Sequence, residues 1–286
     1  MSADQRELVL ALSCPDQKGL VSAVAGYLFA HGCNIVSCQQ HEDALSGNFF
    51  MRVRASYLAT TSLEALQAAF QATADTYGMT WIMTDSATRQ RVAILVSKAE
   101  HCLNDLLFRW RSGQLKIDIP FIASNHPDLA PVAEAAGIPF HHIPVTPATK
   151  PEAEARLLEL IDEHDIDLTV LARYMQILSD DLSRALEGKM INIHHSFLPG
   201  FKGAKPYHQA YDRGVKLIGA TAHYVTSDLD EGPIIEQEVL RVNHKLMPED
   251  LVAVGQDAER VALSRAVRWH TEHRVLLNGT RTVVFN

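Results

Sequence analysis

The residues whose types and spacing could carry out chemistry lie close together in the second half of the sequence. Residues 190–193 predict the end of a buried strand, and side chains two residues apart in a strand point to the same face. Asn192 and His194 should therefore face one side together. Residues 217–226 predict another strand, and residues 227–232 (SDLDEG) form an acidic, polar turn after it. An amide, an imidazole and a carboxylate can thus converge on one pocket.

These three groups suit the transfer of an acyl group. The side-chain amide of Asn192 can donate a hydrogen bond to a developing oxyanion. The imidazole of His194, when protonated, can stabilise that oxyanion or donate a proton to a poor leaving group. A carboxylate of the acidic turn can accept a proton from the nucleophile, directly or through a water molecule. The apolar neighbours Ile193 and Phe197 would limit solvent around them.

Other kinds of site fit this segment less well. Ser196 is not surrounded by a GxSxG elbow, which argues against an acyl-enzyme serine hydrolase, and residues 196–203 predict a loop. After the predicted strand 91–97 the sequence contains no glycine-rich phosphate cradle. We expect a structural, hydrogen-bonding role for His195. Four histidines match no zinc signature, so we predict no metal site: His194, His195, His208 and His223.

The composition is that of a globular chain. Its 286 residues exceed one typical domain, and 47% hydrophobic with 21% charged residues is an ordinary balance. The net charge of −8 argues against a nucleic-acid surface, and no apolar run approaches the ~20 residues that span a bilayer. The four cysteines show no CxxC spacing and the N-terminus lacks a signal-peptide pattern, so we expect a cytoplasmic protein without disulfides.

Residues 1–85 contain the pattern β-α-β-β-α-β, which is that of the ferredoxin-like fold. Turn residues separate its elements, and the small polar residues that follow predict a linker at 86–91. In order, the elements are strand 8–13, helix 19–32, strands 33–41 and 48–56, helix 61–77 and strand 79–84.

The segment around the first helix resembles an ACT domain, a sensing module that usually binds amino acids. The resemblance rests on PDQKGL at 15–20 and GCNI at 32–35. It implies an effector, with glycine and methionine as candidates, whose carboxylate suits a helix N-terminus. The alternative is that this domain only pairs subunits, and a homo-oligomer through ACT pairing is expected. The implied effector residues are Asp16, Gly19, Leu20, Asn34 and Ile35.

Residues 92–286 are expected to form a second, α/β domain with a Rossmann-like architecture. Predicted strands alternate with predicted helices, which indicates a mostly parallel sheet covered on both faces. The ligand cleft of such a sheet lies at the carboxyl ends of its strands, where Asn192 and His194 fall. A long helix at 247–273 and a hairpin about Asn278 follow. The strands are 91–97, 117–125, 139–145, 167–174 and 190–194, and the helices are 101–114, 126–137, 150–165 and 179–188.

Four linked segments resemble the formyltransferase family that uses 10-formyltetrahydrofolate. They are NIH at 192–194, SFLP at 196–199, GATAH at 219–223 and DLDEGP at 228–233. LARYMQIL at 171–178 extends the match, so the resemblance covers roughly residues 91–242. It implies a formyltransferase fold for this domain, with Asn192, His194 and Asp230 as the catalytic set.

The resemblance also implies where the folate pterin binds, namely against the backbone of two loops. We therefore expect 10-formyltetrahydrofolate as a substrate and no permanently bound cofactor. The implied contacts are Met175, Gln176, Ile177 and Leu178 in the first loop and Val225, Asp228 and Leu229 in the second.

One departure from the family pattern bears on the acceptor of the formyl group. In the member that formylates glycinamide ribonucleotide, a glycine-rich loop after the first strand holds the phosphate. Residues 97–101 (SKAEH) replace that loop here, and Glu100 would repel a phosphate. Water is then the expected acceptor. The implied reaction is hydrolysis of 10-formyltetrahydrofolate to tetrahydrofolate and formate, which would supply formate and balance the one-carbon pool for purine synthesis.

Two alternatives stay open at this point. One is formyl transfer from 10-formyltetrahydrofolate to an unidentified amine. The other is an inactive, amino-acid-responsive protein that keeps the folate-binding fold. The presence of the asparagine, the histidine and the aspartate together argues against the second alternative.

Overall fold

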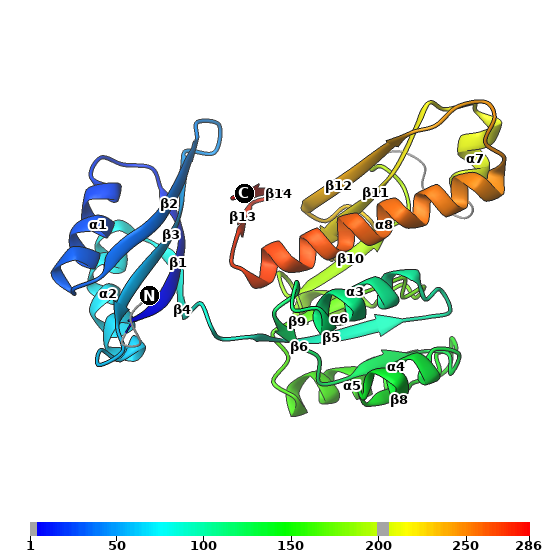
Figure 1. The fold of residues 1–286 in the computed structure, drawn as a ribbon, viewed down its shortest axis with the longest axis horizontal. Coiled ribbons are helices and arrows are strands. Elements are labelled where there is room, and N and C mark those ends of the chain that lie inside the picture. Colours follow the sequence, from blue (N-terminus) through cyan, green and yellow to red (C-terminus); the bar gives the residue numbers. More distant parts are fainter. Residues whose placement is uncertain (1–4, 199–205) are drawn as a thin grey trace. The chain divides into compact units, whose positions relative to one another are not determined.

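Two large sheets organise the chain, and each belongs to a separate compact unit of the computed structural model (Figure 1). The structure describes residues 5–198 and 206–286. The first unit comprises Met1–Arg89 with Glu272–Asn286, and the second comprises Gln90–Thr271. The expected fold class is confirmed: an N-terminal ferredoxin-like domain that fits the ACT type and a Rossmann-like domain with a mostly parallel sheet.

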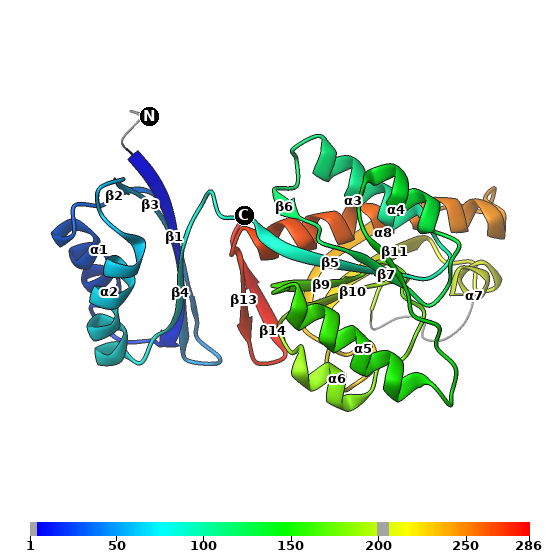
Figure 2. The ribbon, with the colours of Figure 1, turned by 90° about the horizontal axis from the view of Figure 1, so that it is seen from below.

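The first unit is built on an antiparallel sheet with the strand order β2-β3-β1-β4. Its two helices cover one face of that sheet (Figure 2). This order follows from the predicted pattern. Each helix begins at one end of the sheet and carries the chain back to the other end, where the next strand starts. The elements are β1 (Gln5–Pro15), α1 (Leu20–Ala30), β2 (Asn34–Asp43), β3 (Asn48–Leu58), α2 (Leu63–Tyr77) and β4 (Thr80–Asp85).

Helix α2 shows how local chemistry sets these elements. The hydroxyl of Ser62 accepts a hydrogen bond of 3.1 Å from the N–H of Ala65, which satisfies one free donor at the helix start. Gly78 ends the helix in the left-handed region, with φ 62°. Between these caps, Leu66 and Phe70 lie four residues apart and are buried against the sheet.

A hairpin from the end of the chain, β13 (Val275–Asn278) with β14 (Arg281–Val284), belongs to the first unit. It lies on the face of the antiparallel sheet opposite the helices (Figure 2). Its Asn278 and Arg281 side chains both donate to Asp43 Oδ2, at 2.6 and 2.5 Å. The expected second domain includes this tail, whereas in the structure the tail packs on the first unit.

The side chain of Arg52, on β3, explains much of this attachment. It is 8% exposed and donates hydrogen bonds to the carbonyl oxygens of Glu272 and His273, at 2.8 and 3.0 Å. Burial lowers the pKa of Arg52 to about 10, so the guanidinium stays protonated at neutral pH. A buried cation thus satisfies two backbone carbonyls that follow the last helix.

The second unit is built on a sheet with the strand order β12-β11-β10-β9-β5-β7-β8, with β6 beside β5. Strands β5 to β10 pair in parallel, whereas β11 and β12 are antiparallel to their neighbours. The strands are β5 (Gln90–Val96), β6 (Ile117–Asp118), β7 (Ile122–Ser124), β8 (Phe140–His142), β9 (Leu168–Leu171), β10 (Met190–His194), β11 (Leu217–Tyr224) and β12 (Ile234–Arg241).

Helices cover both faces of this sheet. Apolar residues of α5 and α6 pack on β5 and β9, while α8 packs on β10, β11 and β12 from the other face together with α3 (Figure 2). Strand β9 is buried along its whole length, as expected for a central parallel strand. The helices are α3 (His101–Arg111), α4 (Ala130–Ala136), α5 (Lys150–Glu163), α6 (Asp180–Ala185), α7 (Pro206–Asp212) and α8 (Pro248–Thr271).

Three details differ from the sequence-based expectations. The strand expected at 117–125 is split into β6 and β7, because Pro120 lies between them and cannot donate to a ladder. The short helix α7 carries too little periodicity to be predicted. Residues 199–203 of the expected loop lie outside the described residues. Among the helices described, none has both the length and the apolar character to cross a membrane.

Candidate active site

Strands β10 and β11 place the predicted amide and imidazole on one face of the sheet. In this antiparallel pair Asn192 lies opposite His223, and His194 lies opposite Thr221. The alternation of β10 turns Ile191 and Ile193 to the other face, where they are buried. The expectation that Asn192 and His194 share a face therefore agrees with the strand geometry.

Asp230 reaches His194 from the turn that follows β11. Nδ1 of His194 lies 3.2 Å from Oδ2 of Asp230, and the two side chains are 6% and 17% exposed. Because an ionised carboxylate can only accept, Nδ1 of His194 carries the proton of this pair. Nε2 of His194 is buried and has no hydrogen-bond partner within the described part of the chain. This nitrogen is therefore available to a bound molecule.

The turn that carries Asp230 is tightly constrained. Asp230 itself has φ 58°, a left-handed conformation that side chains rarely adopt. A Cβ atom on Gly232 would lie 1.7 Å from the carbonyl oxygen of Tyr224, so only glycine allows the chain to pass so close to β11. Strain of this kind persists where the surrounding structure enforces it, and it fixes the carboxylate beside His194.

His223 orients the amide of Asn192. Nδ1 of His223 lies 2.9 Å from the carbonyl oxygen of Tyr224, which can only accept, so Nδ1 carries the proton. Nε2 then accepts a hydrogen bond from Nδ2 of Asn192 at 3.2 Å. Burial lowers the pKa of His223 and keeps the ring neutral, so the 3.8 Å approach of Nε2 to Asp230 is not an ion pair. Asn192 keeps its second N–H for another acceptor.

The charge of Asp230 is held by its neighbours. Burial alone would raise the pKa of Asp230, but the hydrogen bond from His194 and the surrounding imidazoles outweigh it and lower the pKa below its usual value. His195 stacks on His194 with ring centroids 5.0 Å apart. Burial, and then the charge of Arg173, lower the pKa of His195 to about 4. At neutral pH the site therefore contains a carboxylate beside a neutral His195.

A cavity of about 260 Å³ opens onto these groups. The catalytic residues and the folate contacts predicted from the sequence all line it, and its rim carries exposed apolar side chains such as Met175, Ile177 and Leu229. The structure therefore brings two loops and two strands to one place. The lining from those predictions is Met175, Gln176, Ile177, Leu178, Asn192, His194, Val225, Asp228, Leu229 and Asp230.

Ser97, at the end of β5, anchors the first of these loops. Its buried hydroxyl accepts a hydrogen bond from the N–H of Met175 at 3.0 Å and donates one to Oδ1 of Asn125 at 2.6 Å. The position was predicted as part of an altered phosphate loop, and its role as an anchor was not foreseen. Only the three-dimensional fold brings β5 next to the loop after β9.

Two further residues of the cavity were not predicted as members of the site. Arg173 lines the cavity and adopts a left-handed backbone conformation, with φ 67°. His223 was noted in the sequence as one of several histidines and as part of the GATAH segment, without a role of its own. An antiparallel pairing of β10 with β11 would have placed it opposite Asn192, but the sequence does not specify that register.

The predicted effector residues of the first unit do not come together within one chain. Asp16, Gly19 and Leu20 follow the carboxyl end of β1, whereas Asn34 and Ile35 begin β2. Both strands are antiparallel to β3 and so run in the same direction. The start of β2 therefore lies at the other end of the sheet from the end of β1, as the register of both strands with β3 shows.

Comparisons with known proteins agree with this geometry. A family model described as formyl transferase matches residues 90–267. A formyltetrahydrofolate deformylase from a Corynebacterium species is 55% identical over 99% of each chain. The solved structure of a formyltetrahydrofolate deformylase from Burkholderia mallei matches with a TM-score of 0.95 and 53% identity, over 98% of this chain and 100% of that one.

A more distant likeness covers about two thirds of the chain. The solved structure of glycinamide ribonucleotide transformylase 1 from Symbiobacterium toebii matches with a TM-score of 0.65 and 30% identity. It covers 69% of this chain and 95% of that one. Over that part of the chain the fold is thus shared with a glycinamide ribonucleotide transformylase.

Proposed function

Because this chain belongs to the formyl transferase family, among the formyltetrahydrofolate deformylases, we propose that Asn192, His194 and Asp230 carry out its reaction. That reaction is the hydrolysis of 10-formyltetrahydrofolate to tetrahydrofolate and formate. The observation that supports the residue assignment is the convergence of an amide, a carboxylate-bound imidazole and a carboxylate on one cavity.

Asn192 and His194 act on the formyl group. The second N–H of Asn192 donates to the oxygen that becomes negatively charged when the formyl carbon is attacked. Nε2 of His194, protonated while Nδ1 donates to Asp230, faces the nitrogen that must leave and gives it a proton. Without that proton the nitrogen would leave as an anion, which is why an acid is required here.

Asp230 acts on the water. Its pKa is low enough for the group to be ionised at neutral pH, and its Oδ1 atom is not engaged by His194. The water oxygen attacks the formyl carbon and loses a proton to this carboxylate. The bond between that carbon and the substrate nitrogen then breaks, the nitrogen takes the proton from His194, and formate leaves. The tight turn at Gly232 keeps Asp230 in reach throughout.

The loops around the cavity hold the folate. The N–H and carbonyl groups of Met175–Leu178 and of the turn that contains Asp228 present a polar edge to the pterin, as the resemblance implies. Ser97 fixes the first loop through the N–H of Met175. Exposed Ile177 and Leu229 at the rim would be covered when the substrate binds, which removes water from the reacting groups.

The loop between β5 and α3 supports water as the acceptor. The glycinamide ribonucleotide transformylase from Symbiobacterium toebii, 30% identical to this chain, is named for an acceptor that carries a phosphate. Here Glu100 stands at the start of α3, and its negative charge opposes a phosphate at the helix N-terminus. This supports hydrolysis over transfer to a phosphorylated amine.

The first unit is proposed to sense an amino acid, with glycine and methionine as the candidates. The two groups of predicted contacts, Asp16 with Gly19 and Leu20 and Asn34 with Ile35, lie at opposite ends of one sheet. One complete site would therefore need two chains, which fits a homo-oligomer paired through this unit. Isothermal titration of the whole protein with each amino acid at millimolar concentration tests this, and no heat with either removes both candidates.

We also propose a cytoplasmic location and a role in supplying formate and balancing the folate pool for purine synthesis. All four cysteines are free thiols, and three of them are buried, which fits a reducing compartment. Fractionation of cells with an antibody to the chain tests the location.

The function is tested by incubating the purified protein with 10-formyltetrahydrofolate and no added amine. We expect one formate released for each tetrahydrofolate formed. Binding of the folate without release of formate would contradict hydrolysis and would call for a screen of amine acceptors.

A further inference from the structure

A buried carboxylate outside the catalytic set ties together four segments of the second unit. Glu259, on α8, is 1% exposed. Its Oε2 lies 2.7 Å from Nε2 of His101 on α3, and its Oε1 accepts a hydrogen bond of 2.9 Å from the hydroxyl of Tyr207 on α7. Nε of Arg173 lies 3.5 Å from Oε2. We call these four residues the Glu259 cluster.

Cys102 lies next to the cluster, whose carboxylate already has a cationic neighbour. The thiol of Cys102 lies beside His101 and Glu259, close enough for the three to share an ion. Burial, and then the charge of Glu259, raise the pKa of Cys102 well above its usual value, so the thiol keeps its proton. The guanidinium of Arg173 already supplies a positive charge to the carboxylate. The group is therefore a hydrogen-bonded cluster that fills space.

The ring of Tyr207 is the bulkiest part of the cluster, and α8 makes room for it. A Cβ atom on Gly255 would lie 2.1 Å from Cζ and 2.2 Å from the hydroxyl oxygen of Tyr207. The ring therefore lies directly against the backbone of α8. Because Glu259 follows Gly255 by one turn, the hydroxyl of the seated ring reaches its carboxylate.

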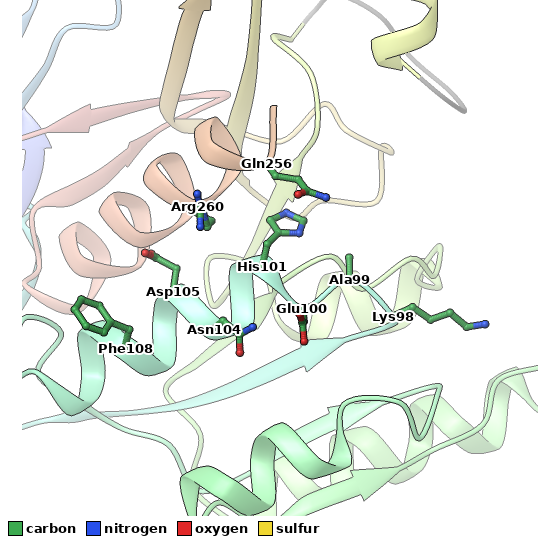
Figure 3. Close-up of a pocket in the computed structure, with 9 residues that line it drawn as sticks. All are labelled: Lys98, Ala99, Glu100, His101, Asn104, Asp105, Phe108, Gln256 and Arg260. Atoms are coloured by element: carbon green, nitrogen blue, oxygen red, sulfur yellow. The ribbon is translucent and has the colours of Figure 1, made fainter. Parts of the chain in front are cut away.

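Two cavities meet this cluster from different directions. Arg173 lines the catalytic cavity of about 260 Å³. His101 lines a larger, polar cavity of about 770 Å³ between α3 and α8, which also contains Lys98, Glu100 and Arg260 (Figure 3). In Figure 3 the imidazole of His101 lies between these two helices. Glu259 contacts both wall residues, so the cluster joins the walls of the two cavities.

We propose that the Glu259 cluster closes the catalytic cavity on its acceptor side, so that water reaches the formyl carbon and a larger amine does not. This inference rests on the proposed function. The larger cavity lies beside the β5–α3 loop, where the transformylase-like pattern has its phosphate site, and an amine acceptor would enter from there. Arg173 lines the catalytic cavity, His101 lines the larger one, and both contact Glu259. The ring of Tyr207, hydrogen-bonded to the same carboxylate, has its centroid 6.4 Å from that of His195, which lines the catalytic cavity.

The charges of the cluster add to this exclusion. An amine carries a positive charge near neutral pH, and its approach would bring it against Arg173 on the cavity wall. Both carboxylate oxygens of Glu259 already accept a hydrogen bond, from His101 and from Tyr207, and Nε of Arg173 lies 3.5 Å from Oε2. A cationic amine would thus find no free acceptor on the cluster, whereas water is uncharged and is not repelled by Arg173. The size and the charge of the cluster therefore both favour water over an amine as the acceptor of the formyl group.

The test measures how the formyl group divides between water and an amine. Wild type, Tyr207→Ala and Tyr207→Phe are each incubated with 10-formyltetrahydrofolate and glycinamide. If the amine attacks, its nitrogen bonds to the formyl carbon and loses a proton, while the folate nitrogen leaves and takes one. The products are N-formylglycinamide and tetrahydrofolate. The ratio of N-formylglycinamide to formate is independent of how much protein is folded.

We expect this ratio to rise by at least about tenfold in Tyr207→Ala and to stay at the wild-type value in Tyr207→Phe, which keeps the ring. Gly255→Ala should give a similar rise, because its Cβ displaces the ring without removing it. Tyr211→Ala, an exposed tyrosine on the same helix, is the matched control and should leave the ratio unchanged.

The two possible failures are distinguishable. A wild-type protein that binds the folate but releases no formate contradicts the proposed function. A wild-type protein that releases formate, together with an unchanged ratio in both Tyr207→Ala and Gly255→Ala, contradicts the closure of the acceptor side.

Discussion

Two buried carboxylates in the second unit have similar neighbours and different accessibility. Asp230 and Glu259 each lie beside an imidazole, and in both the hydrogen bonds and nearby cations outweigh burial and lower the pKa below its usual value. Asp230 nevertheless keeps 17% of its side chain exposed and lines a cavity, whereas Glu259 is 1% exposed with both oxygens engaged.

This difference separates a group that can react from a group that holds structure. A low pKa alone shows that a carboxylate is charged, and it does so equally at both positions. A carboxylate needs in addition a free oxygen and access to a substrate to take up a proton during a reaction. Asp230 has both, on a turn of strained backbone, and Glu259 has neither.

Substitution of Asp230 is expected to have the largest effect, and that effect is on catalysis. Asp230→Asn removes the base that accepts the proton of water, so we expect kcat to fall by about 10²- to 10⁴-fold. The variant keeps the shape of the side chain, so the affinity for tetrahydrofolate by isothermal titration should stay near the wild-type value. Unaltered turnover in this variant would remove Asp230 from the catalytic set.

The second effect is expected on stability. Glu259→Ala leaves His101 and Arg173 buried without their carboxylate, so the free energy of unfolding should fall by about 3–5 kcal/mol in urea denaturation. Hydrolysis per folded molecule should change by less than about tenfold, since no atom of Glu259 contacts the cavity. As a control, Glu249→Ala at the exposed start of the same helix should cost at most about 1 kcal/mol. Equal losses in both variants would contradict a structural role for the cluster.

The smallest effect concerns pH, through His195, which stacks on His194 and is influenced by the charges of Arg173 and Glu259. Its pKa falls from 6.5 in the unfolded chain to about 4 in the fold, so the unfolded state binds more protons between these values. Stability should be complete above pH 6.5 and be lost as the pH falls towards 4, by at most about 3 kcal/mol. His195→Asn should flatten this part of the profile in thermal unfolding. An unchanged slope would show that other groups dominate it.

The sequence predicts the relative positions of two site residues well when they are close along the chain and poorly when they are far apart. The shared face of Asn192 and His194 follows from two-residue alternation in a strand. The place of Asp230 in the same cavity came from the family resemblance, since a turn 36 positions after His194 has no local pattern that aims it there. A predicted sheet indicates at which edge the site lies. It does not indicate which loops come together at that edge.

The Glu259 cluster could not be predicted in this way. Its members lie on α3, α7, α8 and the loop after β9, and no spacing in the sequence connects His101 with a residue 158 positions later. In an amphipathic helix Glu259 would be expected on the solvated face. Burial of a charged residue is recognisable only when its partners are known.

The separation of the effector residues, by contrast, could have been deduced. The helix between β1 and β2 carries the chain back along the sheet, so the two strands run in the same direction. The carboxyl end of β1 and the start of β2 therefore lie a strand length apart. The resemblance to an ACT domain implies which residues contact an effector, but it does not imply that one chain supplies all of them. Physical reasoning about the crossover supplies that information.

The C-terminal hairpin has a consequence for how the protein is made. Residues 1–89 are synthesised before the second unit, yet their own unit also needs Glu272–Asn286, which are synthesised after it. The second unit is continuous and can fold as it is synthesised. Until residues 272–286 have been synthesised, Arg52 has no carbonyl partners from them, and the sheet face opposite the helices lacks its cover. The unit whose synthesis begins before the other is therefore completed only after the second unit has been made.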